Sequence, residues 1–265
     1  MASSRPGPAR ICVTNAKGGT GKTTVAINVA GALGERSRDV LFVDLDPQGN
    51  ATEGLGLLDE YDAAPPTLFD VLTDGDQRDR IGDLVVEHPE MDVVPSNIDM
   101  LQAERELTIA DLVARATALA AVSDEYDYVV VDSPPFYGKL TDTGIFATRN
   151  ILVPALTEAS SERAIELLID QMTALESQTG IAVDTLGVVA NRVETTGEDE
   201  TMLEWFETVF ADDPVWRVRK RVALQRAFSA GQSLFEYDPS VDMADVFLSI
   251  GADLDRQFGY AEVTA

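Results

Sequence analysis

A glycine-rich loop set between an apolar run and a helical segment constrains this chain more than any other feature. Residues 17–24 (KGGTGKTT) follow the apolar run 11–14 and precede a segment with helical spacing over 25–36. Glycines at 18, 19 and 21 allow the backbone to curl with its N–H groups pointing inward, and the helix N-terminus adds partial positive charge. We therefore predict a loop that wraps a polyphosphate.

Short apolar runs alternate with longer helical patterns along the rest of the chain. The expected strands cover residues 11–14, 40–43, 91–94, 128–131, 151–153 and 186–189, and the expected helices cover 25–36, 99–122, 161–177, 198–210 and 242–258. Ser160 or Ser161 is the expected N-cap of the third helix, and residues 49–83 are expected to form an excursion from the core. This alternation predicts an α/β fold with a mainly parallel central sheet flanked by helices.

Length and composition limit the class of protein. The 265 residues are 45% apolar and lack both a leader-like start and an uninterrupted apolar run of 18 residues. We predict a single domain spanning residues 1–265, flexible at 1–9 and 259–265, that is cytoplasmic and does not enter a membrane. The single cysteine, Cys12, excludes an internal disulfide and an iron–sulfur site, and we expect it to be inert core.

The charge balance is strongly acidic. The formal net charge is −26, and four of the 20 basic residues are lysines, of which Lys17 and Lys22 lie in the glycine-rich loop. Dispersed carboxylates keep a surface hydrated, and repulsion among them is screened within about 3 Å at 1 M salt. This composition favours a halophilic source, with an acidic protein from an ordinary cell as the alternative.

The loop has the residues that a phosphate-binding loop requires. Lys22 would reach the β- and γ-phosphates of a nucleotide, and the Thr23 hydroxyl would bind Mg²⁺. The candidate nucleotide-binding residues here are Gly18, Gly19, Thr20, Gly21, Lys22, Thr23 and Thr24, and the resemblance described next adds Lys17. The expected architecture is that of a P-loop NTPase.

The additional lysine, Lys17, makes the loop resemble the deviant Walker A motif (KGGxGKTT) of the ParA, Soj and MinD family of ATPases. The resemblance implies ATP and Mg²⁺ as cofactors. It also implies that Lys17 reaches the nucleotide of a partner subunit, so that ATP binding drives homodimerisation and hydrolysis releases the dimer.

Two further segments match this family. Residues 41–50 (LFVDLDPQGN) resemble its second box, which implies that Asp46 orients the attacking water, with Asp44 nearby. Residues 129–135 (VVVDSPP) resemble its Walker B strand and switch, which implies that Asp132 holds Mg²⁺ through a water. By resemblance the catalytic residues are therefore Lys17, Lys22 and Asp46, and the metal site comprises Thr23, Asp46 and Asp132.

Later segments match less well. Asn191 and Arg192 fall where the family places an asparagine against adenine, and an asparagine offers both a donor and an acceptor to the base. Residues 159–164 (ASSERA) and 218–223 (VRKRVA) depart from the family pattern, and the second lacks the proline that relatives place near the base. The adenine contacts therefore stay open.

Four basic residues are clustered near the second of these segments: Arg217, Arg219, Lys220 and Arg221. One interpretation is a patch that binds DNA phosphates without reading sequence. The other is a cluster neutralised by surrounding carboxylates within the chain or at a dimer interface. The sequence favours neither.

We expect a ParA- or Soj-like Mg-ATPase whose dimerisation switch drives chromosome or plasmid partitioning through non-specific DNA binding and a ParB-like adaptor that stimulates hydrolysis, which would associate it with the nucleoid. One alternative is a MinD-like membrane-positioning ATPase, although the acidic C-terminal segment disfavours lipid binding. Another is a nucleotide-binding scaffold that hydrolyses little ATP. The cargo stays open.

Overall fold

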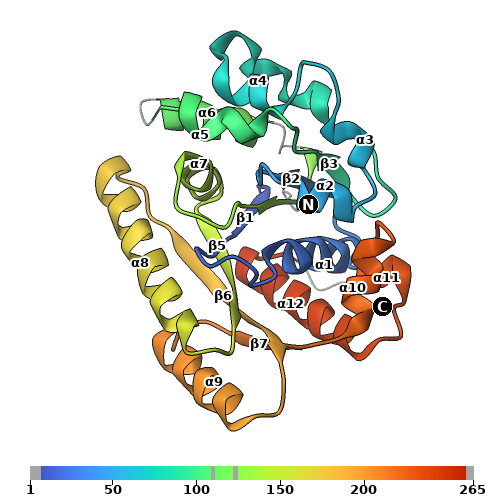
Figure 1. The fold of residues 1–265 in the computed structure, drawn as a ribbon, viewed down its shortest axis with the longest axis vertical. Helices are drawn as coiled ribbons and strands as arrows, with labels where there is room; N and C mark the ends of the chain where they lie inside the picture. Colours follow the sequence, from blue (N-terminus) through green and yellow to red (C-terminus); the bar gives the residue numbers. More distant parts are fainter. Residues whose placement is uncertain (1–6, 109–110, 122–124, 261–265) are drawn as a thin grey trace, which may run out of the picture.

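The computed structural model describes residues 7–108, 111–121 and 125–260. A seven-stranded sheet with the order β3-β2-β4-β1-β5-β6-β7 forms its centre, and all neighbouring strands are parallel (Figure 1). The strands are β1 (Ala9–Val13), β2 (Val40–Asp44), β3 (Asp92–Val94), β4 (Tyr128–Asp132), β5 (Asn150–Leu156), β6 (Asp184–Val193) and β7 (Val215–Arg219). The predicted parallel α/β architecture is confirmed.

Helices cover both faces of the sheet, as buried parallel strands require. One face packs against α1 (Lys22–Glu35), α10 (Val222–Ser229), α11 (Leu234–Tyr237) and α12 (Asp242–Phe258) (Figure 1). The other packs against α4 (Leu68–Thr73), α5 (Met100–Glu106), α6 (Leu112–Ala121), α7 (Lys139–Thr148), α8 (Ser160–Thr179) and α9 (Gly197–Val209). Short elements α2 (Asn50–Gly54), α3 (Leu58–Tyr61) and the 3₁₀ segment η1 (Gly75–Leu84) complete the chain.

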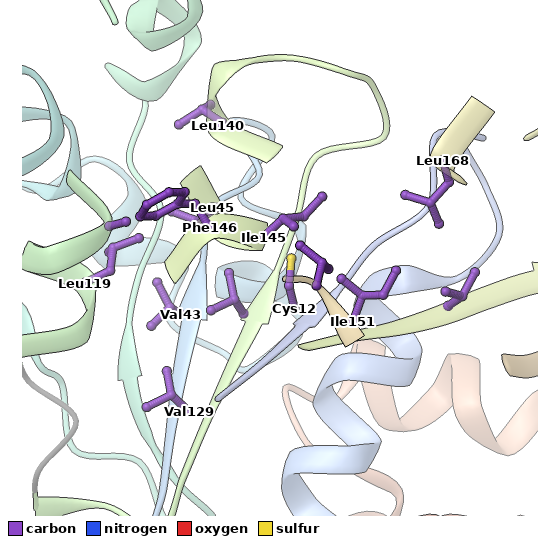
Figure 2. Packing of buried hydrophobic residues seen from close by; sticks show 14 of the residues in the cluster. Cys12, Val43, Leu45, Leu119, Val129, Leu140, Ile145, Phe146, Ile151 and Leu168 are labelled. Atoms are coloured by element: carbon purple, nitrogen blue, oxygen red, sulfur yellow. The ribbon is translucent and has the colours of Figure 1, made fainter. Parts of the chain in front are cut away.

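The core on the second face forms where α7 lies across the sheet. Figure 2 shows Ile145 and Phe146 of α7 beside the strand residues Cys12, Val43 and Ile151. A Cβ added to Gly144 would lie 3.2 Å from the Cys12 sulfur, so the small residue allows the helix to approach the sheet closely. Cys12 is fully buried, and its expected place in the core is confirmed.

Several predicted boundaries were wrong. The helix expected over 99–122 is two helices, because Leu107 is extended and ends α5; residue 122 lies outside the described residues. The N-cap of α8 is Ala159 rather than Ser160 or Ser161. Strand β7 and helices α7 and α10 were not predicted. The excursion at 49–83 contains α2, α3, α4 and most of η1.

Residues near both chain ends contact the rest of the fold. Ala9 belongs to β1, and the Tyr260 ring is buried and stacks on Tyr128 with 5.0 Å between centroids. The Tyr260 hydroxyl also donates to the carbonyl oxygen of Asp127 at 2.5 Å. The flexible ends stay a prediction, and residues 1–6 and 261–265 lie outside the described ranges. The single domain stays a prediction.

Candidate active site

The carboxyl ends of three adjacent strands bring the predicted acidic residues together. Asp132 ends β4 and lies in register with Val13 of β1 on one side and with Asp44 of β2 on the other. The phosphate loop follows β1 directly, and Asp46 follows β2 two residues after Asp44. Ligands of open parallel sheets bind at this edge of the sheet, where the chain changes direction across the strands.

The phosphate loop has the backbone form that its glycines permit. Gly19 and Gly21 have φ values of 77° and 86°, a left-handed conformation that other residues rarely adopt. Gly21 is the N-cap of α1 and supplies no side-chain hydrogen bond to the first turn. The N-terminus of α1 is therefore an anion-binding position with N–H groups that a phosphate can satisfy.

Lys22 is the buried cation of this site. It is 6% exposed, and burial lowers the pKa of its ammonium group while the nearby carboxylates of Asp132 and Asp46 oppose that shift. Burial likewise raises the pKa of Asp46, which is 4% exposed. A lysine held in a water-poor pocket beside carboxylates provides concentrated positive charge for phosphate oxygens.

Asp132 lies next to the loop without hydrogen-bond partners. It is fully buried, and neither carboxylate oxygen accepts a hydrogen bond from the described residues. Burial, together with the charge of Asp44, raises the pKa of Asp132 well above its usual value. The Thr23 hydroxyl lies near enough to oppose this shift, although its geometry falls short of a hydrogen bond.

These orphaned oxygens fit a cation. In the described ranges, no three His, Cys, Asp or Glu side chains are grouped to bind a metal by themselves. Mg²⁺ usually keeps several waters and binds through one or two protein ligands plus substrate phosphates. The Asp132 carboxylate beside the Thr23 hydroxyl matches that mode, whereas a cage built from protein ligands alone does not.

Asp44 and Asp46 differ in their surroundings. Asp44 is fully buried; one oxygen accepts from the Thr52 N–H and hydroxyl, both at 2.8 Å, and the other accepts from the Asp46 N–H at 3.0 Å. Burial raises its pKa to about 7. Asp46 instead accepts one hydrogen bond, from the Gln48 N–H at 3.0 Å. Asp44 therefore organises the segment that carries Asp46.

The side chain of Lys17, the additional lysine of the loop, contacts residues that follow β5. Its ammonium group lies 2.7 Å from a Glu158 oxygen and 2.6 Å from the Ser160 hydroxyl, both just beyond β5. The Lys17 side chain is 25% exposed, and its partner carboxylate is 55% exposed. Lys17 is therefore accessible at the surface of the site and is held by a solvent-exposed ion pair.

A cavity of about 680 Å³ opens beside the end of the phosphate loop. Thr24 and Asn191 line it on the loop side, and Leu224 and Phe228 of α10 supply apolar surface. The Asn191 amide donates to the Thr20 carbonyl oxygen at 2.9 Å, so β6 is tied to the loop. This volume is within the usual range of small-molecule sites.

Arg192 also lines this cavity and has a left-handed backbone, with φ of 56°. Its N–H donates to the Asn191 side-chain oxygen at 2.9 Å. Both ends of the Asn191 amide are thus engaged in holding the site, and each retains a further donor or acceptor for a base. The missing proline leaves the aromatic Phe228 and aliphatic Leu224 as apolar walls.

Each residue of the basic cluster pairs with a carboxylate. Arg217 lies 2.9 Å from Glu207, Lys220 lies 2.9 Å from Glu194, and Arg219 and Arg221 both lie 2.6 Å from Asp242. Three of them, Arg219, Lys220 and Arg221, line the cavity beside the phosphate loop. Because Arg219 and Arg221 share Asp242, four cations meet three carboxylates, so the cluster is paired but not fully neutralised within the chain, and both interpretations of the sequence stay open.

Sequence analysis missed several residues that shape the site. Thr52 and Ser96 hold the Asp46 segment, and Leu224 and Phe228 wall the cavity. Ser96 lies two residues after the end of β3, so the rule that polar residues after parallel strands gather at one edge could have found it. Thr52, Leu224 and Phe228 lie on helices and carry no such signal.

Comparison with known proteins agrees with this geometry. The family model for an AAA domain matches residues 9–184. The sporulation initiation inhibitor protein Soj of Bacillus subtilis is 33% identical over 92% of this chain and 97% of its own, and the chromosome partitioning protein ParA of Myxococcus xanthus is 31% identical over 93% and 88%.

A solved structure of the septum site-determining protein MinD from Pyrococcus horikoshii, complexed with Mg-ADP, shares the fold. It has a TM-score of 0.74 over 95% of this chain and 98% of its own, at 24% identity. The extent of the Soj and ParA matches, together with the glycine-rich loop and its adjacent carboxylates, shows that this chain belongs to the ParA, Soj and MinD family of P-loop ATPases.

Proposed function

We propose that this chain is a partitioning ATPase that binds and hydrolyses Mg-ATP and uses the nucleotide as a dimerisation switch. The observation that carries the proposal is the buried Asp132 carboxylate, which accepts no hydrogen bond from the described residues and lies beside Lys22 and the phosphate loop. An uncompensated buried carboxylate is costly unless a cation completes it. The MinD structure with Mg-ADP supports magnesium nucleotide as the ligand.

Each site residue then has a task. Lys22 and the first turn of α1 bind the β- and γ-phosphates, and Asp132 with Thr23 would hold Mg²⁺, which neutralises charge on the phosphate oxygens. Asp46 orients the attacking water from the end of its strand. The base enters the cavity between Asn191 and the apolar surface of α10. Phosphoryl transfer needs such positioning and charge more than covalent help from the protein.

Lys17 is the residue through which a second subunit would complete the site. It is partly exposed, and its ion pair with Glu158 lies at the surface, where such pairs are worth about 0–1 kcal/mol. That contact is weak enough to exchange for the phosphates of a nucleotide bound by a second copy. ATP would thereby favour the homodimer, and loss of the γ-phosphate would release it.

The proposed cargo is a chromosome or plasmid, reached through non-specific DNA binding and a ParB-like adaptor that stimulates hydrolysis. The likeness to Soj and to the chromosome partitioning protein ParA supports this cargo. Arg217, Arg219, Lys220 and Arg221 stay the proposed DNA contacts, and their ion pairs with carboxylates would have to be exchanged for DNA phosphates. Nucleoid association follows only if that exchange occurs.

Single-site variants test the ATPase mechanism. Lys17→Ala and Asp46→Ala should retain affinity for a fluorescent ATP analogue while losing at least about 100-fold in phosphate release, because each acts on the transition state. Arg163→Ala, which removes an exposed ion pair with Glu166, is the control and should hydrolyse normally. Full turnover in both site variants would exclude the mechanism.

The cargo is tested by ATPase stimulation. Hydrolysis at high KCl should rise with DNA and rise further with a candidate adaptor, and Arg219→Ala with Lys220→Ala should reduce the DNA effect.

A MinD-like role predicts ATP-dependent flotation with anionic liposomes instead. No described helix is long and apolar enough to cross a bilayer, and the apolar residues Phe247, Ile250 and Leu254 of α12 are buried in the core.

A further inference from the structure

The backbone of Asp46 is fixed on both sides by buried side chains. Its N–H donates to Asp44 at 3.0 Å, and its carbonyl oxygen accepts from the Ser96 hydroxyl at 2.7 Å. Asp44 and Ser96 are both 0% exposed. The same carbonyl oxygen also accepts from the Gly49 N–H at 2.9 Å. Because buried hydrogen bonds have no competing water, these contacts together hold the direction of the Asp46 backbone.

The contacts with Asp44 and Ser96 belong to one closed ring. The Thr52 hydroxyl donates to Asp44 at 2.8 Å and accepts from the Ser96 N–H at 2.9 Å, while the Ser96 hydroxyl returns to Asp46. The ring joins the end of β2, helix α2 and the turn after β3. Both donors of Ser96, its N–H and its hydroxyl, are used within the ring, so Ser96 holds this geometry rather than filling space.

A second set of contacts is made by Glu104, eight residues after Ser96. The Glu104 carboxylate of α5 accepts from the N–H groups of Lys139 at 2.9 Å and Leu140 at 2.8 Å, which form the first turn of α7. The Lys139 ammonium group donates back to the Glu104 carbonyl oxygen at 2.7 Å. A Cβ on Gly138 would lie 2.6 Å from a Glu104 oxygen, so the contact is close.

The start of α7 directly follows the turn at residues 133–138, which continues from Asp132. That turn also meets the phosphate loop, since a Cβ on Gly18 would lie 3.8 Å from the Pro135 side chain. Between Ser96 and Glu104, Met100 and Ala103 anchor α5 in the core at 0% exposure. Residues 96–104, termed the link segment, therefore connect the Asp46 segment to the turn after Asp132.

We propose that the link segment couples these two parts of the site, with Ser96 and Glu104 as positioning residues for hydrolysis. Movement of the 133–138 turn shifts the first turn of α7, Glu104 carries that shift into α5, and Ser96 passes it to the Asp46 carbonyl. Asp46 is thus aligned for the attacking water only while the turn is in place. This inference rests on the proposed ATPase function.

Hydrogen–deuterium exchange of the nucleotide-free protein tests the coupling without any turnover. Ser96→Ala should raise exchange at the amides of Lys139 and Leu140, and Glu104→Gln should raise it at Asp46 and Thr52. The matched controls are Thr148→Ala, which removes a buried hydroxyl bonded to the Gly144 carbonyl, and Glu176→Gln, which removes a carboxylate bonded to the Val183 N–H. If each substitution raises amide exchange only near its own position in the link segment, the inference is wrong.

Steady-state kinetics test the positioning role. Ser96→Ala and Glu104→Gln should each lower kcat about tenfold and leave KM for ATP within about twofold, because misalignment affects the transition state more than binding. The double variant should lose less than the product of the two, since both act through one path. If Ser96→Ala fails to fold, Glu104→Gln alone still tests the positioning role.

The two levels of proposal fail differently. A wild-type chain that binds no ATP or never hydrolyses it contradicts the proposed function. A wild-type chain that hydrolyses ATP while both variants keep the wild-type kcat contradicts only the link segment.

Discussion

Two buried aspartates lie at opposite ends of β4. They differ in the hydrogen bonds that their carboxylates accept. Asp255 of α12, 1% exposed, contacts the beginning of β4 by accepting from the Tyr128 hydroxyl at 3.0 Å, and it also accepts from Arg36 at 2.9 Å and Arg38 at 3.0 Å. Asp132 at the other end is equally buried and accepts no hydrogen bond from the described residues.

This difference separates a structural charge from one prepared for a ligand. Arg36, Arg38 and Tyr128 compensate the buried charge of Asp255 and fasten α12 to α1 and the sheet. Asp132 has no such network: the charge of Lys22 partly offsets its own, but no described residue donates a hydrogen bond to it, so a cation is needed to complete its stabilisation. Two equally buried carboxylates therefore have different roles: Asp255 stabilises the fold, and Asp132 is available to a ligand.

The largest effect is expected from Asp132→Asn. The variant should lose about 100- to 1,000-fold in kcat at saturating Mg-ATP, because a carboxylate that holds the metal is gone. Its free energy of unfolding without nucleotide should stay the same or rise, since an uncompensated charge is removed. Phosphate release and urea titration measure the two quantities, and a strongly destabilised variant would show that Asp132 has a structural partner.

Asp255→Asn should show the reverse pattern. Removing one partner of a buried ion pair costs about 3–5 kcal/mol, because Arg36 and Arg38 then lack their anion. Turnover per folded molecule should be unchanged. Urea unfolding and kcat are compared with those of Asp245→Asn, an exposed position on the same helix. A loss of kcat in the folded Asp255→Asn variant would show that Asp255 also affects catalysis, and the contrast between Asp255 and Asp132 would then be wrong.

The pH dependence of stability is a smaller effect, and Asp44 is one of the groups that contribute to it. Burial raises its pKa to about 7, so the folded state binds more protons than the unfolded state as pH rises from about 4 to about 7. Its contribution to stability is therefore complete below pH 4 and is lost as pH approaches 7.

Asp44→Asn removes that titration. The stability of the wild-type chain relative to this variant should fall by at most a few kcal/mol across the window, because the neutral amide cannot ionise. Urea midpoints at constant ionic strength, taken in steps from pH 4 to pH 8 without nucleotide, measure the trend. A relative stability that rises with pH would mean that Asp44 is ionised and stabilised in the folded chain.

The smallest effect is expected at the exposed pair. Glu158→Ala should change the free energy of unfolding by less than about 1 kcal/mol, because its contact with Lys17 is solvent-exposed and screened by salt. Thermal melts at low and molar KCl should show little difference from wild type. A loss comparable to that of Asp255→Asn would place this pair among the structural charges.

Local sequence predicted six strands, including the edge strand β3, and missed the other edge strand, β7. Residues 128–131 and 40–43 are apolar throughout because both faces of their strands are covered. Strand β7 escaped prediction because its side chains alternate: Arg217 and Arg219 face solvent while Trp216 and Val218 are buried. Its arginines were interpreted only as a basic cluster.

Helices depended more on tertiary contacts. Helix α7 was missed because threonines at 141, 143 and 148 and a glycine at 144 lower helix propensity, and its close packing on Cys12 compensates. The predicted helix over 99–122 ignored the extended backbone at Leu107, for which the apolar pattern gives no signal. Periodicity alone cannot place such a break.

The sequence by itself determined the phosphate loop, the strand before it and the helix after it, because glycine conformations and strand–turn–helix order are local properties. It also supplied the acidic residues that the resemblance identified. Only the tertiary structure decided which carboxylates have hydrogen-bond partners: Asp255 meets Arg36 across 219 positions, Asp242 meets Arg219 across 23, and Asp132 accepts no hydrogen bond within the described chain. Partner contacts of this kind depend on how distant segments pack, which no local pattern records.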